Sequence, residues 1–296
     1  MSKEHRRLIS FAGSTVAIEY SGSRIAAIID FLFQYVPAGS DVLPHVTYRA
    51  TSDVQPEVLT LCRDDSLIYE GDSEAALAEL LLGDTCHHLA DQSRGGLLFH
   101  AAGLAWQGKG VLVPGKIGAG KTTLTAWLVA KGLDYLTDEL VFVPHEADTI
   151  QTFTRPLNVK TAARAALQAV LPFDFETHAP HILSTSRADL IPPDLLRPVQ
   201  LSEPPLGLII FARYLPDSEF SLRLLTKAQA GLALMECLVN ARNLPGHGFA
   251  EIARLAKTAP AYKLSYANFD QIGEQIETLK PGFSQATTEI ASGKRL

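Results

Sequence analysis

One short stretch in the middle of the chain restricts its fold more than any other. Residues 115–122 read Gly-Lys-Ile-Gly-Ala-Gly-Lys-Thr, with four free positions between the first glycine and a Gly-Lys-Thr ending. The apolar run at 111–113 predicts a buried strand before it. A helix is predicted after it by side chains at helical spacing and a final glycine, namely Leu124, Trp127, Leu128, Lys131 and Gly132. A glycine-rich loop between a strand and a helix predicts an α/β fold with a phosphate loop.

This loop has the composition of an anion-binding site. Its glycines let main-chain N–H groups turn inward, and the following helix adds partial positive charge at its N-terminus. Lys121 is expected to reach the β- and γ-phosphates of a nucleotide, and Thr122 to bind the Mg²⁺ between them. Lys116 either adds charge near the phosphates or points to solvent, and the alternative for the whole loop is a connector that fits the pattern by chance. The residues expected to contact the nucleotide are Gly115, Lys116, Ile117, Gly118, Ala119, Gly120, Lys121, Thr122 and Thr123.

Two acidic residues follow the next predicted strand. Residues 133–137 have strand composition, Asp138-Glu139 comes directly after them, and a second apolar run covers 140–143. Near a phosphate loop, one carboxylate can hold Mg²⁺ while the other accepts the proton of an attacking hydroxyl. The alternative is an exposed turn, because an isolated acidic pair is usually solvated. Their position after the loop and helix favours the functional interpretation.

The order of these features resembles one family in particular. The chain is similar to the catalytic domain of the bacterial HPr serine kinase/phosphorylase family, whose core shares its phosphate-loop arrangement with ATP-dependent phosphoenolpyruvate carboxykinase. The matching features are collinear over roughly 45 residues. They are His100, Gly108-Lys109-Gly110-Val111-Leu112, the loop at 115–122, Lys131-Gly132 and Asp138-Glu139.

The resemblance implies a fold and a set of roles. It implies a mixed sheet flanked by helices and an ATP- and Mg²⁺-dependent kinase that phosphorylates a serine of a protein or peptide. Lys121 and Thr122 would bind phosphate and metal, Asp138 would be the base, Glu139 would lie near Mg²⁺, and His100 would place the transferred phosphoryl group. Self-association into a homo-oligomer is implied as well.

The chain departs from the family pattern at three places. Glu139 stands where the family has Asp, and Ile117 stands where it usually has Ser. Residues 143–147 replace the Glu-Ile-Arg-Gly-like stretch that the bifunctional enzymes use in the phosphorylase direction. We therefore expect kinase activity without phosphorylase activity.

A second stretch, at 153–160, also resembles a strand of the HPr-kinase-like proteins. It contains Arg155, followed by proline, and Lys160. Cations there would neutralise charge on the phosphates during transfer. The alternative is a solvated strand edge, because arginine and lysine side chains are usually exposed.

Composition limits the remaining possibilities. The 296 residues exceed one average domain, and 47% hydrophobic content with a net charge of −6 is an ordinary globular mixture. No basic stripe is present, so nucleic acid is not an expected partner. No secretory signal or membrane span is found, and three widely spaced cysteines fit reduced thiols, so we expect a cytoplasmic protein. Cys86-His87-His88 contains metal-binding side chains but lacks a second set of ligands.

Residues 1–95 are predicted to form a smaller α+β domain for recognition or adaptation. Strand composition is found at 11–20, 46–49, 58–61 and 66–69. Residues 25–36 fit either a helix or a buried strand, whereas Ser73 predicts the start of a helix that runs through His88 and ends near Gly95-Gly96.

Residues 96–280 are predicted to form the catalytic domain, and 281–296 a flexible tail. An irregular, proline-rich segment at 172–205 suggests a lid that recognises substrate. Two other functions share the same motifs: a kinase of a small hydroxylated metabolite, and a regulator that senses nucleotide without catalysis. An enclosed pocket would favour the first, and an orientation of Asp138 and His100 away from the γ-phosphate position would favour the second.

Overall fold

The computed structural model describes residues 4–37, 39, 42–52, 58–116 and 118–273. Main-chain contacts divide the chain into two compact units. Unit one contains Met1–Gly95 and Phe153–Pro198, and unit two contains Gly96–Thr152 and Val199–Leu296. The division after residue 95 is where the sequence predicts a domain boundary. Residues 153–198, in contrast, group with the N-terminal segment and not with the phosphate loop.

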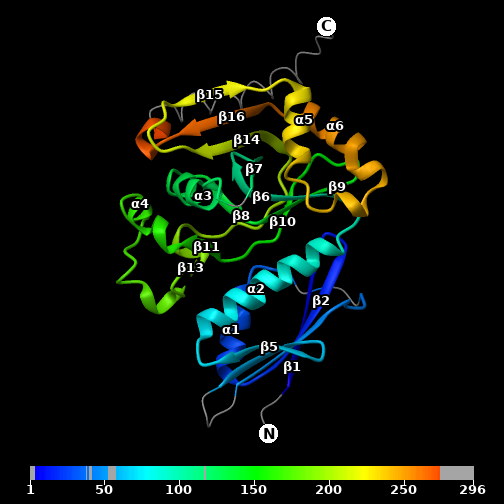
Figure 1. Cartoon of the computed structure of the whole chain (residues 1–296), viewed down its shortest axis with the longest axis vertical. Helices are drawn as coiled ribbons and strands as arrows, with labels where there is room; N and C mark the ends of the chain where they lie inside the picture. Colours follow the sequence, from blue (N-terminus) through cyan, green and yellow to red (C-terminus); the bar gives the residue numbers. More distant parts are fainter. Residues whose placement is uncertain (1–3, 38, 40–41, 53–57, 117, 274–296) are drawn as a thin grey trace. The chain divides into compact units, whose positions relative to one another are not determined.

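Unit one contains a mixed sheet covered by two helices (Figure 1). Its strand order is β1-β2-β3-β4-β5, and only the β2–β3 pair is parallel. The strands are β1 (His5–Phe11), β2 (Ser14–Ser21), β3 (Thr47–Ser52), β4 (Leu59–Arg63) and β5 (Ser66–Gly71). Helices α1 (Ser23–Phe33) and α2 (Glu74–Asp91) contact each other and this sheet.

The two helices form for different local reasons. In α1 the buried residues recur every three or four positions, which resolves the ambiguity at 25–36 in favour of a helix. They are Ile25, Ile28, Ile29, Leu32 and Phe33. Helix α2 begins after Ser73, whose hydroxyl accepts a hydrogen bond from the Ala76 N–H at 3.2 Å. This cap satisfies an N–H group that the first helical turn leaves without a partner.

Residues 153–198 contribute a second sheet to unit one. Its order is β11-β13-β12, with both pairs antiparallel. The elements are β11 (Leu157–Lys160), η1 (Thr161–Ala163), α4 (Arg164–Gln168), η2 (Ala179–His181), β12 (Leu183–Ser184), β13 (Ala188–Ile191) and η3 (Pro193–Leu195). The segment predicted to be an irregular lid therefore contains strands that pair with β11 and with each other.

Unit two is built on a larger mixed sheet. Its order is β10-β9-β6-β7-β14-β16-β15, and β8 also pairs with β6. Strand β14 lies between β7 and β16 and is parallel to both, so the carboxyl ends of the three strands lie at one edge of the sheet. The strands are β6 (Gly96–Trp106), β7 (Lys109–Pro114), β8 (Asp134–Thr137), β9 (Leu140–Pro144), β10 (Gln151–Thr152), β14 (Leu206–Tyr214), β15 (Ser221–Leu224) and β16 (Ala261–Tyr266).

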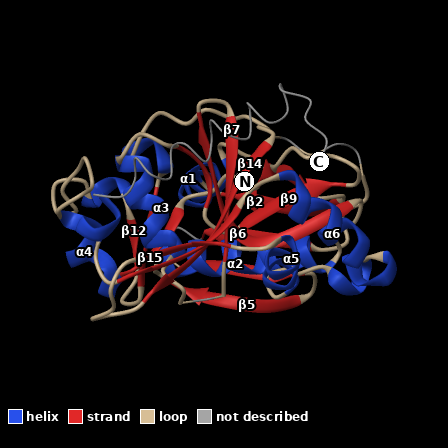
Figure 2. Cartoon of the chain, turned by 90° about the horizontal axis from the view of Figure 1, so that it is seen from above, coloured by secondary structure: helices blue, strands red, loops and turns tan. Residues whose placement is uncertain are grey.

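Three helices cover this sheet. Helix α3 (Lys121–Ala130) contacts β6 and β8, while α5 (Lys227–Met235) and α6 (Phe249–Thr258) lie side by side in both views (Figures 1 and 2). Thr226 and Gln229 form a capping box at the start of α5. Asn268 accepts a hydrogen bond from the Gln271 N–H at 3.0 Å and begins a helix whose predicted end, like the tail at 281–296, lies outside the described residues.

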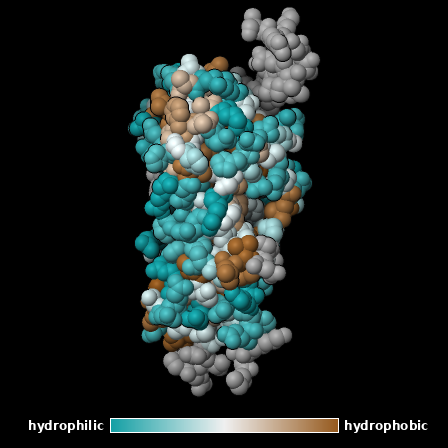
Figure 3. Space-filling view, turned by 90° about the vertical axis from the view of Figure 1, so that its right-hand side faces the viewer, coloured by the Kyte–Doolittle hydropathy of each residue, from teal (hydrophilic) through white to brown (hydrophobic). Residues whose placement is uncertain are grey.

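The fold is thus a mixed α/β architecture, with two mixed sheets covered by helices and a smaller antiparallel sheet in unit one. Among the described residues, no helix combines the length and the apolar character that crossing a membrane requires. The face drawn in Figure 3 is mostly hydrophilic, with hydrophobic side chains in small separate groups. Scattered groups of this kind are normal on a protein surface.

Candidate phosphate-binding site

The glycine-rich loop lies between a strand and a helix, as its pattern predicts. Strand β7 is buried from Gly110 to Pro114, and α3 begins at Lys121. Gly118 and Gly120 have positive φ angles of 85° and 89°, which residues with a Cβ rarely adopt. Ile117, which the sequence assigns to the nucleotide contacts, lies outside the described residues.

Lys121 is buried at the start of α3, with 6% of its surface exposed. Its Nζ donates hydrogen bonds to the carbonyl oxygens of Gly115 at 2.7 Å and Lys116 at 3.1 Å. A Cβ at position 115 would lie 3.3 Å from Lys121 Cδ, so glycine leaves room for the lysine chain. Burial lowers the pKa of the Lys121 ammonium, while Glu139 and Asp138 act in the opposite direction. The loop therefore holds a desolvated cation that an anionic ligand would stabilise.

Asp138 lies directly beside the start of α3. The carboxylate is 2% exposed and accepts a hydrogen bond from the Thr122 hydroxyl at 3.2 Å. The Tyr135 hydroxyl donates to its other oxygen at 3.4 Å. Because β8 is antiparallel to β6, as β7 is, the residue that follows β8 lies at the same sheet edge as the loop. The predicted metal ligand and the predicted base are thus in contact.

Glu139 and His100 form a second pair in unit two. His100 Nε2 lies 3.4 Å from Glu139 Oε1, with side chains 20% and 34% exposed. His100 is in the middle of β6, not at its start, and Ala101 lies opposite Pro114 in the sheet. The His100 carbonyl accepts a hydrogen bond from the Gly115 N–H at 3.4 Å. Pairing of β6 with β7 therefore places His100 where the loop begins.

The remaining loop positions face different surroundings. Lys116 is exposed, and its Nζ lies 3.0 Å from Oε2 of Glu236, a residue that sequence reasoning did not single out. The Ala119 carbonyl accepts a hydrogen bond from the Tyr214 N–H at 3.3 Å. Thr123, the third residue of α3, is half-buried.

Arg155 and Lys160 belong to unit one, whereas the phosphate loop belongs to unit two. Arg155 is 3% exposed and precedes β11, whereas Lys160 is exposed at the end of that strand. A solvated position thus fits Lys160 but not Arg155.

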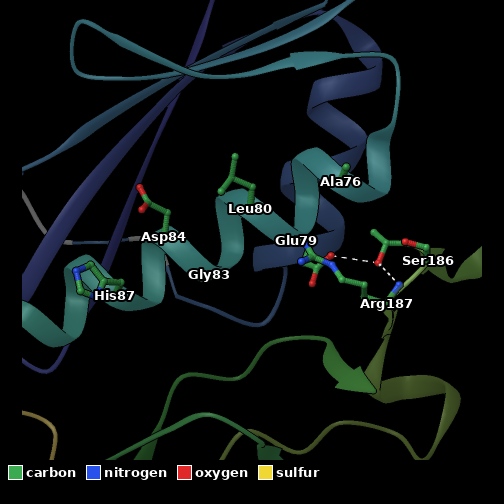
Figure 4. A pocket seen from close by; sticks show the side chains of 9 residues that line it. Ala76, Glu79, Leu80, Gly83, Asp84, His87, Ser186 and Arg187 are labelled. Atoms are coloured by element: carbon green, nitrogen blue, oxygen red, sulfur yellow. Dashed lines mark hydrogen bonds between the residues drawn. The ribbon is translucent and has the colours of Figure 1, made fainter. Parts of the chain in front are cut away.

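Unit one contains a groove that the sequence analysis did not predict (Figure 4). It has a volume of about 490 Å³ and runs between α2 and the turn after β12. The Thr185 hydroxyl donates to Glu79 across it at 3.2 Å. Its walls are Ala76, Glu79, Leu80, Gly83, Asp84, His87, Thr185, Ser186 and Arg187. Among the described residues, no group of three or more His, Cys, Asp or Glu side chains is arranged to hold a metal.

Comparison with known proteins found no match. No protein-family model matches the chain, and no curated protein matches it. Its chemistry therefore follows from the residues themselves. Unit two brings together a positive-φ glycine loop, a desolvated lysine, a threonine hydroxyl, two carboxylates and a histidine, and such a set can bind a polyphosphate and accept a proton beside it.

Proposed function

We propose that the chain is an ATP- and Mg²⁺-dependent kinase that transfers the γ-phosphoryl group to a serine hydroxyl of a protein or peptide, without phosphorylase activity. The supporting observation is the 3.2 Å hydrogen bond between Thr122 and Asp138 at the start of α3, next to the buried Lys121. In this proposal unit two has a core of the HPr kinase type, related to that of ATP-dependent phosphoenolpyruvate carboxykinase.

The residues present fit a triphosphate and its metal ion. Main-chain N–H groups of the loop and the N-terminus of α3 offer donors and positive potential to phosphate oxygens. Lys121 would exchange its carbonyl partners for phosphate oxygens, which compensate its charge better than neutral carbonyls do. Thr122 and a neighbouring carboxylate would hold Mg²⁺, which supplies charge neutralisation on the phosphates when it is bound.

We propose that the two carboxylates exchange the roles that the family resemblance implies. Asp138 is 2% exposed and bonded to Thr122, so it is placed to share a metal ion with that hydroxyl. Glu139 has a side chain that is 34% exposed and paired with His100, so a hydroxyl from solvent can reach it. In this assignment Glu139 accepts the proton of the attacking serine, while the bond between the γ-phosphorus and the ADP oxygen breaks.

The partners of the reaction belong to the same proposal. A serine of a protein or peptide is the acceptor, and His100 orients Glu139 and the transferred group. The proposal also includes a homo-oligomer. It places the kinase in the cytoplasm, where the thiols of Cys62, Cys86 and Cys237 would stay reduced.

The test measures transfer from radiolabelled ATP to a library of serine-containing peptides. Asp138→Asn is expected to raise the Mg²⁺ concentration needed for half-maximal rate by about tenfold or more, because a metal ligand is weakened. Glu139→Gln is expected to lower the maximal rate by about 100-fold or more at saturating Mg²⁺, because the base is lost.

Other outcomes of the same assay discriminate between assignments. If Asp138→Asn abolishes the rate at every Mg²⁺ concentration and Glu139→Gln changes only the Mg²⁺ requirement, the roles are those that the resemblance implies. If MgATP binds but no peptide is labelled and free serine is, the acceptor is a small molecule. If the chain binds MgATP but transfers phosphate to no hydroxyl, the function is that of a nucleotide sensor and not of a kinase.

A further inference from the structure

The phosphate loop has two chemically different sides in unit two. On the β6 and β8 side lie Asp138, Glu139 and His100. On the other side β7 pairs in parallel with β14, which pairs in parallel with β16, so the carboxyl ends of these strands lie beside the loop. Both strands end in tyrosine, at Tyr214 and Tyr266. One side is thus acidic and the other aromatic.

Tyr214 is fixed to the loop through its backbone. Its N–H donates to the Ala119 carbonyl at 3.3 Å. A Cβ added at Gly120 would lie 3.2 Å from Tyr214 Cβ and 3.2 Å from the Tyr266 hydroxyl. Both tyrosines therefore contact the glycine that precedes Lys121, the residue expected to bind phosphate.

The ring of Tyr214 packs against a series of other aromatic side chains. It meets Tyr266 edge to face, with ring centres 5.8 Å apart and planes at 61°. Tyr266 is 2% exposed and stacks on Phe269, which in turn stacks on Trp127 at 5.5 Å. Burial raises the pKa of Tyr266, so its hydroxyl stays protonated. Tyr214 itself remains 48% exposed at the end of this series.

We propose that Tyr214 is the stacking platform for the base of the bound nucleotide, an inference that rests on the proposed function. A nucleotide has a charged terminal phosphate and an aromatic base at its two ends. The acidic side of the loop suits the metal-bound end, which leaves the base on the β14 and β16 side. Ligands of open α/β sheets bind beyond the carboxyl ends of the strands, where Tyr214 lies. A supported, exposed aromatic ring stacks on a base at low cost in side-chain entropy.

The experiment compares two probes that share phosphates and differ in the base. Binding of MgATP and of Mg²⁺ with inorganic tripolyphosphate is measured by calorimetry on the full chain. Tyr214→Ala is expected to weaken MgATP binding about tenfold and to leave tripolyphosphate binding unchanged. Tyr214→Phe should restore MgATP binding, because the ring and not the hydroxyl supplies the stacking. Phe249→Ala removes an aromatic side chain that is 66% exposed on α6 and should change neither affinity.

The outcomes separate this inference from the proposed function. If the parent chain binds neither probe, the phosphate site itself is rejected and the platform with it. If the parent binds both and Tyr214→Ala weakens neither, only the platform is rejected. Equal weakening of both probes would also overturn it, because the substitution would then have damaged the loop. Thermal unfolding of each variant monitors the fold, and Tyr214→Leu, which keeps an apolar side chain but has no ring, replaces the alanine variant in the same comparison if that variant unfolds.

Discussion

Each unit buries a charged side chain beneath its surface, but the two are compensated differently. In unit one Asp189 is 0% exposed and bonded to the Arg164 guanidinium and, at 2.7 Å, to the Ser184 hydroxyl. The hydrogen bond to Asp189 raises the pKa of Arg164. In unit two Lys121 is bonded to main-chain carbonyls and its pKa is lowered.

This difference separates a structural charge from one prepared for a ligand. A buried charge with an opposite partner and satisfied hydrogen bonds holds elements together, here α4 and β13. Lys121 donates its hydrogen bonds to neutral carbonyl oxygens, and its pKa stays lowered although Asp138 and Glu139 oppose the shift, so its charge is incompletely compensated and an anion would stabilise it further. The comparison assigns stability to the first group and binding to the second, and substitutions can test each assignment.

The largest expected effect on stability is in unit one. Arg164→Met would leave the Asp189 carboxylate buried without its countercharge. We expect the free energy of unfolding to fall by about 3 kcal/mol. This is the lower end for a broken buried pair, because the Arg164 side chain is itself 39% exposed. The measurement is chemical unfolding. Arg49→Met is the matched control, since its surface ion pairs with Glu19 and Asp65 are worth about 0–1 kcal/mol.

A double substitution makes this test more specific. Arg164→Met with Asp189→Leu removes both charges and should recover most of the lost stability, because no buried charge remains without a partner. A double variant as unstable as the single one would show that packing, including the contact of Arg164 with Phe175 at 5.6 Å, dominates over charge.

Lys121→Met is expected to affect binding more than stability. MgATP affinity should fall about 100-fold, equivalent to ~2.8 kcal/mol at 1.4 kcal/mol per tenfold, because the cation nearest the phosphates is lost. In the absence of nucleotide the free energy of unfolding should be unchanged or slightly higher, because the substitution removes a desolvated charge. Calorimetry and chemical unfolding measure the two quantities, and a large loss of stability with unchanged affinity would reverse the comparison.

The same lysine predicts a dependence of stability on pH. Its folded pKa is below the ordinary value of 10.5, so between these two values the unfolded chain binds more protons than the folded one. The free energy of unfolding contributed by Lys121 therefore rises with pH in that window. The parent should gain stability relative to Lys121→Met as pH increases toward 10.5. A constant difference across that range would argue against a desolvated ammonium.

The loop and its neighbours also show which features sequence can predict. The strand, the loop and α3 are contiguous, so their spacing is visible in residues 111–132, and Ser73 marks the start of α2 for the same local reason. The order of strand, helix and acidic pair predicted that the acids lie near the loop, but the hydrogen bond between Thr122 and Asp138 was not predicted, because the sequence assigned Glu139 and not Asp138 to the metal beside Thr122. Local patterns were sufficient for the elements and their order, but not for this contact.

Features that depend on distant pairing were not predictable in this way. The grouping of 153–198 with unit one depends on contacts between distant segments, such as those of Phe153 with Phe11 and Phe33 and those of β12 with α2. The position of Tyr214 beside the loop requires the parallel pairing of β7 with β14. The ion pair of Lys116 with Glu236 likewise joins elements far apart in the chain. Periodicity alone contains no information on such partners.

A smaller effect is expected from Gly120→Ala in the loop. Its φ of 89° costs about 1–2 kcal/mol for a residue with a Cβ, and the new atom would press on both tyrosines at 3.2 Å. Gly108→Ala is the matched control, because φ is 76° and no heavy atom of the described residues lies within 4 Å. The difference between the two losses, measured by chemical unfolding, isolates the contact with Tyr214 and Tyr266. Equal losses of stability in the two variants would mean that the contact with Tyr214 and Tyr266 costs nothing.

The smallest expected effect has the opposite sign and lies in α2. Gly83 is helical, lines the groove of unit one, and has no heavy atom of the described residues within 4 Å of the place that a methyl group would occupy. Gly83→Ala should therefore stabilise the chain by about 0.5–1 kcal/mol, because alanine loses less backbone entropy in a helix. Gly231→Ala in α5, where the methyl would make ordinary contacts at 3.9 Å, should give a similar gain in unit two. A loss at Gly83 alone would mean that the α2 wall of the groove is closer to its neighbours than its open geometry indicates.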